Sequence, residues 1–194
     1  MTSILVVCTG NICRSPIAEG LLRAALARRL GSDPPDVSSA GTAGWEGSAA
    51  MPESVEAARE RGVEIERHVA RRLEASHVDA ADLIVTMASE HRDAITAWMP
   101  EVADRVFTLK ELVRLVESMA PPTAAPDLAT RVAAAAARRR EGFTGNPLDD
   151  DVADPLGMPL DSYRAIAWEL DEWTERLAEG LAGPVPVPAQ REEA

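Results

Sequence analysis

The sequence predicts an α/β fold, a single three-layer domain with a central, mostly parallel, twisted sheet of about four strands and helices on both faces. Short apolar runs typical of buried strands alternate with longer segments of helical periodicity. This alternation favours a parallel sheet whose strands are joined by right-handed crossovers. The chain has 194 residues, enough for one well-packed core and few for two.

The first half of the chain contains the expected strand and helix signals in order. The apolar run 4–7 predicts the first strand, and a helix is expected over 16–30, with an apolar stripe formed by Leu21, Leu22, Ala25, Leu26 and Leu30. Residues 37–40 predict a second, short strand before a glycine-rich turn. The next helix is expected over 52–61, because Gly62 is a typical residue after a helix end.

The second half repeats the pattern. Residues 82–87 predict a buried strand, a helix is expected over 89–98, and 105–108 predict a short strand. The final helix is expected over 160–181, where the apolar residues at helical spacing are Ile166, Leu170, Trp173 and Leu177. Ligands of such sheets bind beyond the carboxyl ends of the strands.

The segment between the first strand and the first helix has the composition of an anion-binding loop. It reads Cys8, Thr9, Gly10, Asn11, Ile12, Cys13, Arg14, Ser15 and Pro16. Gly10 and Asn11 readily take the left-handed conformations that turn successive N–H groups towards one anion. The following helix directs its free N–H groups to the same point, and Arg14 can bind two phosphoryl oxygens. Cys8 is then the candidate nucleophile, because such surroundings favour a thiolate.

This string predicts the hydrolysis of phosphate monoesters. We expect Ser15 to donate a hydrogen bond to the sulfur of Cys8. The alternative is that Cys8 is a small buried hydrophobic residue in an ordinary loop. The complete string between a strand and a helix favours the catalytic interpretation.

A cysteine phosphatase also needs an acid that protonates the leaving oxygen. Asp154 is the candidate, because a residue before a proline is extended and Asp154 precedes Pro155, so it should project from a loop. Asp149, Asp150 and Asp151 are competitors for this role. We interpret those three as a solvated acidic turn.

These motifs resemble those of the low-molecular-weight protein tyrosine phosphatases, a family that shares its fold with arsenate reductases and protein-arginine phosphatases. The resemblance covers about residues 2–112 and 146–181. It implies that Cys8 is the nucleophile, that Arg14 clamps the phosphate, and that Asp154 acts first as acid and then as base.

The resemblance also assigns roles around the phosphate. Asn11 would organise the loop, Ser15 would bond the thiolate, and Cys13 would form a reversible disulfide with Cys8. The residues expected to bind phosphate or substrate are Thr9, Gly10, Asn11, Ile12, Cys13, Ser15, Trp45 and Leu156.

Three positions bear on the choice of substrate. Leu156 stands after Asp-Pro, where family members usually have aromatic residues, so ring stacking is lost on that side. Trp45 is either the opposite aromatic rim of the pocket or a partly buried core residue. Ile12 is expected to face the pocket entrance, where related arginine phosphatases have threonine. It therefore favours phosphotyrosine over phosphoarginine.

We expect a catalytic domain over 1–182 and a disordered or extended tail over 183–194. Relative to the family, the domain contains an insertion at about 111–145. A helix is expected over 109–119, and a second one, capped by Asp127, should reach its arginine-rich end, formed by Arg138, Arg139 and Arg140. These arginines fit a solvated helix end that is stabilised by the helix dipole. The alternative is a docking element for acidic residues beside a phosphotyrosine.

Composition restricts cofactors and partners. The formal net charge of -12 argues against binding to nucleic acid or acidic membranes. The two cysteines both lie in the loop, so neither a disulfide framework nor a zinc site is expected. His68 is expected beneath the loop, whereas His77 and His91 are interpreted as surface or helix residues. No metal or cofactor is therefore predicted.

The sequence thus predicts a metal-independent cysteine phosphatase that acts on protein phosphotyrosine and releases inorganic phosphate. A catalytic thiol that must stay reduced, and the lack of a signal peptide or apolar span, favour the cytoplasm. Three alternatives stay open: a protein-arginine phosphatase, a thiol-coupled arsenate reductase, and a non-catalytic phosphotyrosine-binding module.

Overall fold

The computed structural model describes residues 2–122, 127–143 and 149–186. Its centre is a sheet of four parallel strands in the spatial order β2-β1-β3-β4. The strands are β1 (Ser3–Cys8), β2 (Asp36–Gly41), β3 (Leu83–Thr86) and β4 (Val106–Thr108). The predicted α/β class, with a single domain and about four strands, is confirmed.

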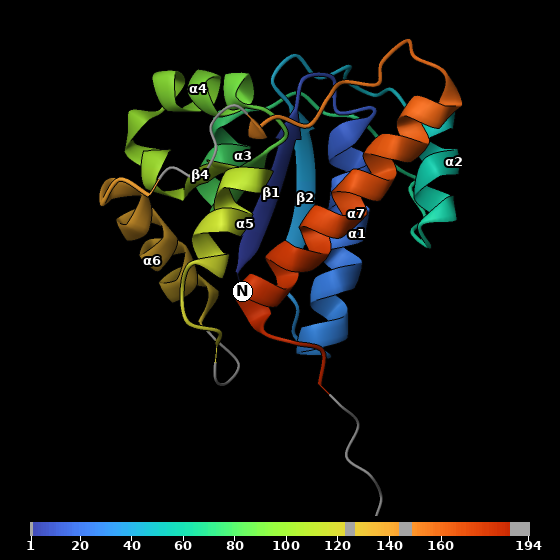
Figure 1. Cartoon of the computed structure of the whole chain (residues 1–194). Helices are drawn as coiled ribbons and strands as arrows, with labels where there is room; N and C mark the ends of the chain where they lie inside the picture. The colour runs from blue at the N-terminus through green and yellow to red at the C-terminus, as the bar shows by residue number, and fades with distance from the viewer. Residues whose placement is uncertain (1, 123–126, 144–148, 187–194) are drawn as a thin grey trace, which may run out of the picture.

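Helices cover both faces of this sheet (Figure 1). Ile4, Val6 and Cys8 of β1 belong to the larger apolar cluster, and Leu5 and Val7 to the smaller one. This alternation follows from the period of two along a strand. The larger cluster includes residues of α1 (Arg14–Leu30), α2 (Pro52–Glu60), α5 (Leu109–Glu117), α6 (Leu128–Arg140) and α7 (Leu160–Ala182). The smaller one includes residues of α3 (Ala75–Ala80), α4 (Ser89–Trp98) and the 3-10 helix η1 (Pro100–Arg105).

Most predicted elements occur within two residues of their expected bounds. The first helix begins at Arg14 rather than at residue 16, because a proline in the first turn is compatible with a helix. The start of α5 is fixed by a capping box between Thr108 and Glu111. Asp127 caps α6 as expected, since its side chain accepts a hydrogen bond from the N–H of Ala129 at 3.2 Å.

Helix α6 supplies hydrogen-bond donors to backbone carbonyl groups of η1 and of the edge strand β4. Arg139 donates to the carbonyl oxygens of Val106 at 2.8 Å and Ala103 at 2.6 Å. Its guanidinium also lies 4.2 Å from the centre of the Phe107 ring. The neighbouring Arg138 pairs with Glu141, and Arg140 pairs with Asp104. The arginine-rich end is thus engaged within the molecule.

Parts of the predicted insertion and tail, namely 123–126, 144–148 and 187–194, lie outside the described residues. Helix α7 ends at Ala182, and Gly183 follows it with a φ of 86°. Within the described ranges, no helix is long and apolar enough to cross a lipid bilayer.

Candidate active site

The loop between β1 and α1 directs its carbonyl groups outward. Five successive carbonyl oxygens accept hydrogen bonds from neighbouring segments at 2.8–3.0 Å. The oxygens of Cys8, Thr9 and Gly10 accept from the N–H groups of Thr42, Ala43 and Trp45, in this order. The oxygen of Asn11 accepts from Nε2 of His68, and that of Ile12 from the N–H of Met51. With the carbonyls held outside, the loop can present its N–H groups to an anion.

Asn11 fixes the shape of this loop from within. It has a φ of 57°, in the left-handed region that asparagine tolerates better than most residues. Its amide nitrogen donates to the hydroxyls of Ser15 at 2.9 Å and Ser39 at 2.8 Å, while its Oδ1 accepts from the N–H of Arg71 at 2.9 Å. Gly41 permits the close packing, because a Cβ there would lie 2.5 Å from the carbonyl oxygen of Thr9.

The thiol of Cys8 lies at the end of β1, where the loop begins. Its sulfur is 3.0 Å from the hydroxyl of Ser15 and accepts a hydrogen bond from the N–H of Asn11 at 3.3 Å. Both donors stabilise negative charge on the sulfur. Helix α1 starts a few residues later without a side-chain cap, so its first N–H groups remain available to an anion.

Cys13, at the N-cap of α1, has a different environment. Burial raises the pKa of this thiol to about 11, although hydrogen bonds with Ser54 and Tyr163 act in the opposite direction. Both cysteines are buried and reduced. Cys13 is therefore held as a neutral thiol at neutral pH.

Arg14 connects the loop to a segment that is far away in the sequence. Its Nη1 donates to the carbonyl of Val152 at 3.1 Å, and its Nη2 to the hydroxyl of Thr9 at 3.2 Å. Nη2 also lies 2.6 Å from Oδ2 of Asp154. The Nε of this buried side chain has no hydrogen-bond partner among the described residues, which leaves it available for a phosphoryl oxygen.

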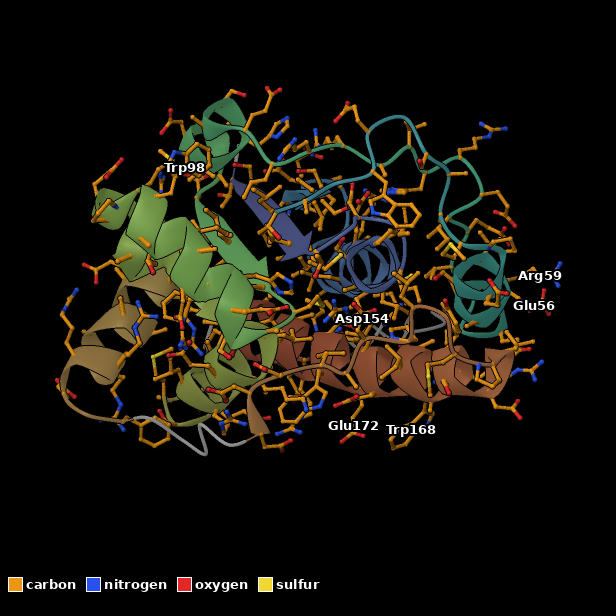
Figure 2. The ribbon with its side chains drawn as sticks, turned by 90° about the horizontal axis from the view of Figure 1, so that it is seen from above. Glu56, Arg59, Trp98, Asp154, Trp168 and Glu172 are labelled. Carbon is orange, nitrogen blue, oxygen red and sulfur yellow. The ribbon has the colours of Figure 1, made fainter. Side chains whose placement is uncertain are left out.

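Asp154 projects from a loop over the N-terminal end of α1, in the centre of the view in Figure 2. Its side chain is 44% exposed, and its Oδ1 accepts a hydrogen bond from the N–H of Leu156 at 3.1 Å. The carboxylate is thus fixed at both oxygens. Because it contacts the arginine of the loop, it can reach a group bound there.

The predicted solvated acidic turn is wrong for one of its three residues. Asp150 is only 6% exposed and forms an ion pair with Arg114. Asp151 is exposed, yet its carboxylate accepts the N–H of Ser89 at 2.6 Å, at the start of α4. Asp149 is exposed and pairs with Lys110 at 3.2 Å. These carboxylates hold the loop in place because each has a defined partner.

Two apolar side chains are exposed beside the site. Trp45 is 52% exposed, and Leu156 is 44% exposed. Trp45 lies next to the loop, since its N–H donates to the carbonyl of Gly10 and its ring would lie 3.7 Å from a Cβ added at that residue. The alternative of a core tryptophan is therefore wrong. Ile12 is only 2% exposed, so the expected position at the entrance is not found. It belongs to the larger apolar cluster.

Two histidines contact the loop. His68 supports the loop as expected, through the 2.8 Å contact with the carbonyl of Asn11. His91 lies on α4, as the helix alternative of the prediction allowed, but it is buried, and its Nε2 lies 2.9 Å from the hydroxyl of Thr9. Burial, reinforced by the charge of Arg14, lowers the pKa of His91 to about 4. Sequence periodicity could not reveal this contact, because it depends on where α4 meets the sheet edge.

No group of three or more histidine, cysteine or acidic side chains with a metal-binding arrangement occurs in 2–122, 127–143 and 149–186. The charge at the site instead comes from Arg14, the loop and the end of α1. These elements form a candidate anion site with the thiol of Cys8 on one side and the carboxylate of Asp154 on the other.

Comparison with known proteins decides the family. The family model of the low molecular weight phosphotyrosine protein phosphatases matches residues 3–121. The chain belongs to this family. The predicted family and enzyme class, a hydrolase of the low-molecular-weight protein-tyrosine-phosphatase type, are confirmed.

Members of this phosphatase family with two named activities are similar to the chain. A protein-arginine-phosphatase of Geobacillus stearothermophilus is 34% identical over 92% of this chain and 95% of its own length. The low molecular weight protein-tyrosine-phosphatase Etp of Escherichia coli K12 is 45% identical over 54% of this chain and 67% of its own.

Solved structures of the family share the fold. A low molecular weight protein tyrosine phosphatase from T. tengcongensis has a TM-score of 0.70 and 34% identity, covering 93% of this chain and 100% of that one. A YwlE mutant from Bacillus subtilis has a TM-score of 0.70 and 31% identity, covering 93% and 99%.

Proposed function

We propose that this phosphatase hydrolyses phosphotyrosine in proteins through a phosphorylated Cys8. The observation that carries the proposal is the convergence of three groups: Cys8 at the start of the anion loop, Arg14 at its end, and Asp154 at 2.6 Å from Arg14. A nucleophile, an anion clamp and an acid are what the reaction requires.

In the first step the sulfur of Cys8 attacks phosphorus, and the phosphorus–oxygen bond to the substrate breaks. Asp154 gives its proton to the leaving oxygen, so that a neutral phenol departs. Arg14 and the loop N–H groups stabilise the charge on the equatorial oxygens. In the second step water attacks phosphorus while Asp154 takes a proton from it. The bond to sulfur breaks, which releases inorganic phosphate and restores the thiolate.

The remaining site residues would shape the anion loop and bind the substrate. Thr9, Gly10 and Asn11 form the loop, while Ser15 supports the sulfur through the 3.0 Å contact. Trp45 and Leu156 supply apolar walls for an aryl group. An exposed indole on one side is consistent with an aromatic leaving group.

A second candidate is protein phosphoarginine. The observation that favours it is the relative from G. stearothermophilus, named a protein-arginine-phosphatase, which matches nearly the full length of both chains. Ile12 does not decide between the two substrates, because its side chain is buried in the larger apolar cluster instead of facing the pocket entrance. Thiol-coupled arsenate reduction would need a thiol from another molecule, since both cysteines of the chain lie in the loop.

Phosphate release from matched phosphotyrosine, phosphoarginine and phosphoserine peptides tests the proposal, without metal and with a reductant. We expect release from phosphotyrosine, and a loss of about 1,000-fold or more in kcat/KM for Cys8→Ser, since that change removes the nucleophile. Preference for phosphoarginine would establish the second candidate. Equal turnover by parent and variant would sink the assignment of Cys8, and binding without turnover by the parent would leave a binding module.

The proposal also covers the cellular compartment, the extent of the catalytic domain and the partners of the enzyme. We place the enzyme in the cytoplasm, where a thiol nucleophile stays reduced, and assign residues 1–182 to the catalytic domain, with the insertion at about 111–145. Cys8 and Cys13 form a reversible disulfide in this proposal. Phosphorylated proteins are its partners, whereas nucleic acid, membranes and cofactors have no part in it.

A further inference from the structure

The segment 149–154, here called the acid loop, is held by a buried cation of α5. Lys110 is 4% exposed, and its Nζ donates to the carbonyl of Asp151 at 3.0 Å. The same atom lies 3.2 Å from Oδ1 of Asp149 and 2.7 Å from Oε1 of Glu169 on α7. One ammonium therefore uses its three donors on three partners, two of which belong to the acid loop.

A second cation on the same helix contacts Asp150, which lies between Asp149 and Asp151. Arg114 lies one turn after Lys110 and forms an ion pair with Asp150, which is only 6% exposed. Side chains four apart lie on the same face of a helix. This face of α5 thus contacts three successive residues of the acid loop.

The contacts continue from this clamp to the acid itself. The N–H of Val152 donates to the carbonyl of Met87 at 2.7 Å, and its carbonyl accepts from Arg14 at 3.1 Å. Two residues later, Asp154 reaches Arg14. The acid loop is therefore fixed at its start by α5 and at its end by the arginine of the phosphate site.

We propose that Lys110 is a positioning residue for the general acid. It touches no reacting atom, but it sets where the acid loop begins and hence where the carboxyl group of Asp154 meets the leaving oxygen. The inference rests on the proposed role of Asp154. The competing explanation is that Lys110 only joins α5 to α7 through Glu169, which would affect folding but not proton transfer.

The basicity of the leaving group separates the two explanations. A p-nitrophenolate is weakly basic and departs almost without a proton, whereas an unsubstituted phenolate needs one. A displaced acid therefore slows phenyl phosphate far more than p-nitrophenyl phosphate. General damage to the fold would slow both alike. The parameter to compare is kcat/KM, because it includes the departure of the first leaving group and excludes hydrolysis of the phosphorylated cysteine.

The experiment measures kcat/KM on both substrates for the parent, Lys110→Met, Asp154→Asn and Arg29→Met. Methionine keeps the length of the side chain and removes its charge. Arg29→Met is the matched control, since Arg29 is also a buried cation, pairs with Glu175 of α7 at 2.7 Å, and contacts no residue of the acid loop in any described bond. Urea unfolding confirms that each variant is folded.

We expect Lys110→Met to lower kcat/KM about 100-fold on phenyl phosphate and about 10-fold or less on p-nitrophenyl phosphate, as for an acid displaced by about 1 Å. Asp154→Asn should show the same selectivity, more strongly, and Arg29→Met none. Should Lys110→Met not fold, the exposed Asp149→Asn takes its place, because it weakens the same contact from the loop side, and we expect the same selectivity with a smaller effect.

The outcomes are distinguishable. If Asp154→Asn discriminates between the substrates and Lys110→Met, or its substitute, behaves like Arg29→Met, the positioning role is overturned while the function stands. If Asp154→Asn itself loses both substrates equally, the assignment of Asp154 as acid fails, and the role of Lys110 fails with it.

Discussion

His91 connects the first turn of α4 to the arginine of the phosphate site. Its Nε2 lies 2.9 Å from the hydroxyl of Thr9, which in turn accepts a hydrogen bond from Arg14 at 3.2 Å. Because burial and the nearby guanidinium lower the pKa of His91 to about 4, its ring is neutral at neutral pH. A second positive charge beside Arg14 is thereby avoided, and the ring serves as a fixed hydrogen-bond partner.

The lowered pKa of His91 predicts a specific dependence of stability on pH. An unfolded histidine titrates near 6.5, so between about pH 6.5 and pH 4 the unfolded chain binds more protons at this residue than the folded one. The stability of the parent should fall as the pH is lowered through this window, by at most about 1.4 kcal/mol per pH unit from this group. His91→Asn lacks the group.

Urea unfolding of the parent and His91→Asn at pH 7, 6 and 5 measures this contribution. The free-energy difference between the two proteins should shift with falling pH in favour of the variant. Parallel pH dependences would show that His91 has an ordinary pKa in the folded protein.

At this scale, contiguous residues were predictable, and among the distant ones His68 was expected beneath the loop, but other distant contacts were not predictable. The positions of Cys8, Asn11 and Ser15 follow from one short string, whose spacing limits how the chain can turn. The contacts of His91 and Lys110 depend on how separate helices meet the sheet edge, and no local pattern encodes that. Ile12 shows the converse error, because an apolar residue in a loop can be buried by the neighbouring segments as easily as exposed.

Among the elements, α6 has a role beyond its own packing. An edge strand presents unpaired backbone groups, and proteins often cover such edges. Here Arg139 donates to the carbonyl of Val106 on β4 and to that of Ala103 in η1, while its guanidinium stacks on Phe107. The sequence predicted α6 from its cap and alanine run, and it suggested solvated arginines, which fits Arg140 but not Arg139. It also missed α3, whose six residues are too short for a periodic signal.

The two neighbouring arginines of α6 provide a matched test of this role. Arg139→Ala should lower the free energy of unfolding by about 2 kcal/mol, because it leaves two backbone acceptors without a donor. Arg138→Ala should change it by less than about 0.5 kcal/mol, since that side chain is 42% exposed and pairs with an exposed glutamate. Urea unfolding measures both. Equal effects would mean that the bonds of Arg139 to the β4 edge contribute nothing specific.

Across the whole molecule, charged groups lie mainly at the surface and at the candidate anion site, whereas the helices pack on the sheet through apolar residues. The formal net charge is -12, yet the proposed phosphate site gathers positive charge locally from Arg14, the loop and the start of α1. Helix α7 packs through apolar residues on the larger cluster and carries partly exposed ion pairs at its borders, for example Arg164 with Glu60 and Arg176 with Glu117. The alternation of strands and helices made this architecture predictable, whereas the ion pairs between distant helices were not.

This distribution predicts how salt affects folding. Partly exposed ion pairs contribute little, and their loss by screening should be small. Repulsion among the excess acidic groups opposes the compact state and is screened by the same salt. We therefore expect Tm to rise by about 2 °C between 0.01 M and 0.5 M NaCl, a range over which the Debye length falls well below 10 Å. A lower Tm in the thermal melt at high salt would show that the surface ion pairs dominate.

Lys110 is the only lysine of the sequence, and its amine is buried between α5, α7 and the acid loop. All other basic side chains except the three histidines are guanidinium groups. An acylating reagent that attacks primary amines therefore meets no exposed lysine on the folded molecule. Acylation of this lysine therefore requires an opening that frees its amine from the acid loop and from Glu169, so the rate of its modification reports how readily the packing around that loop opens.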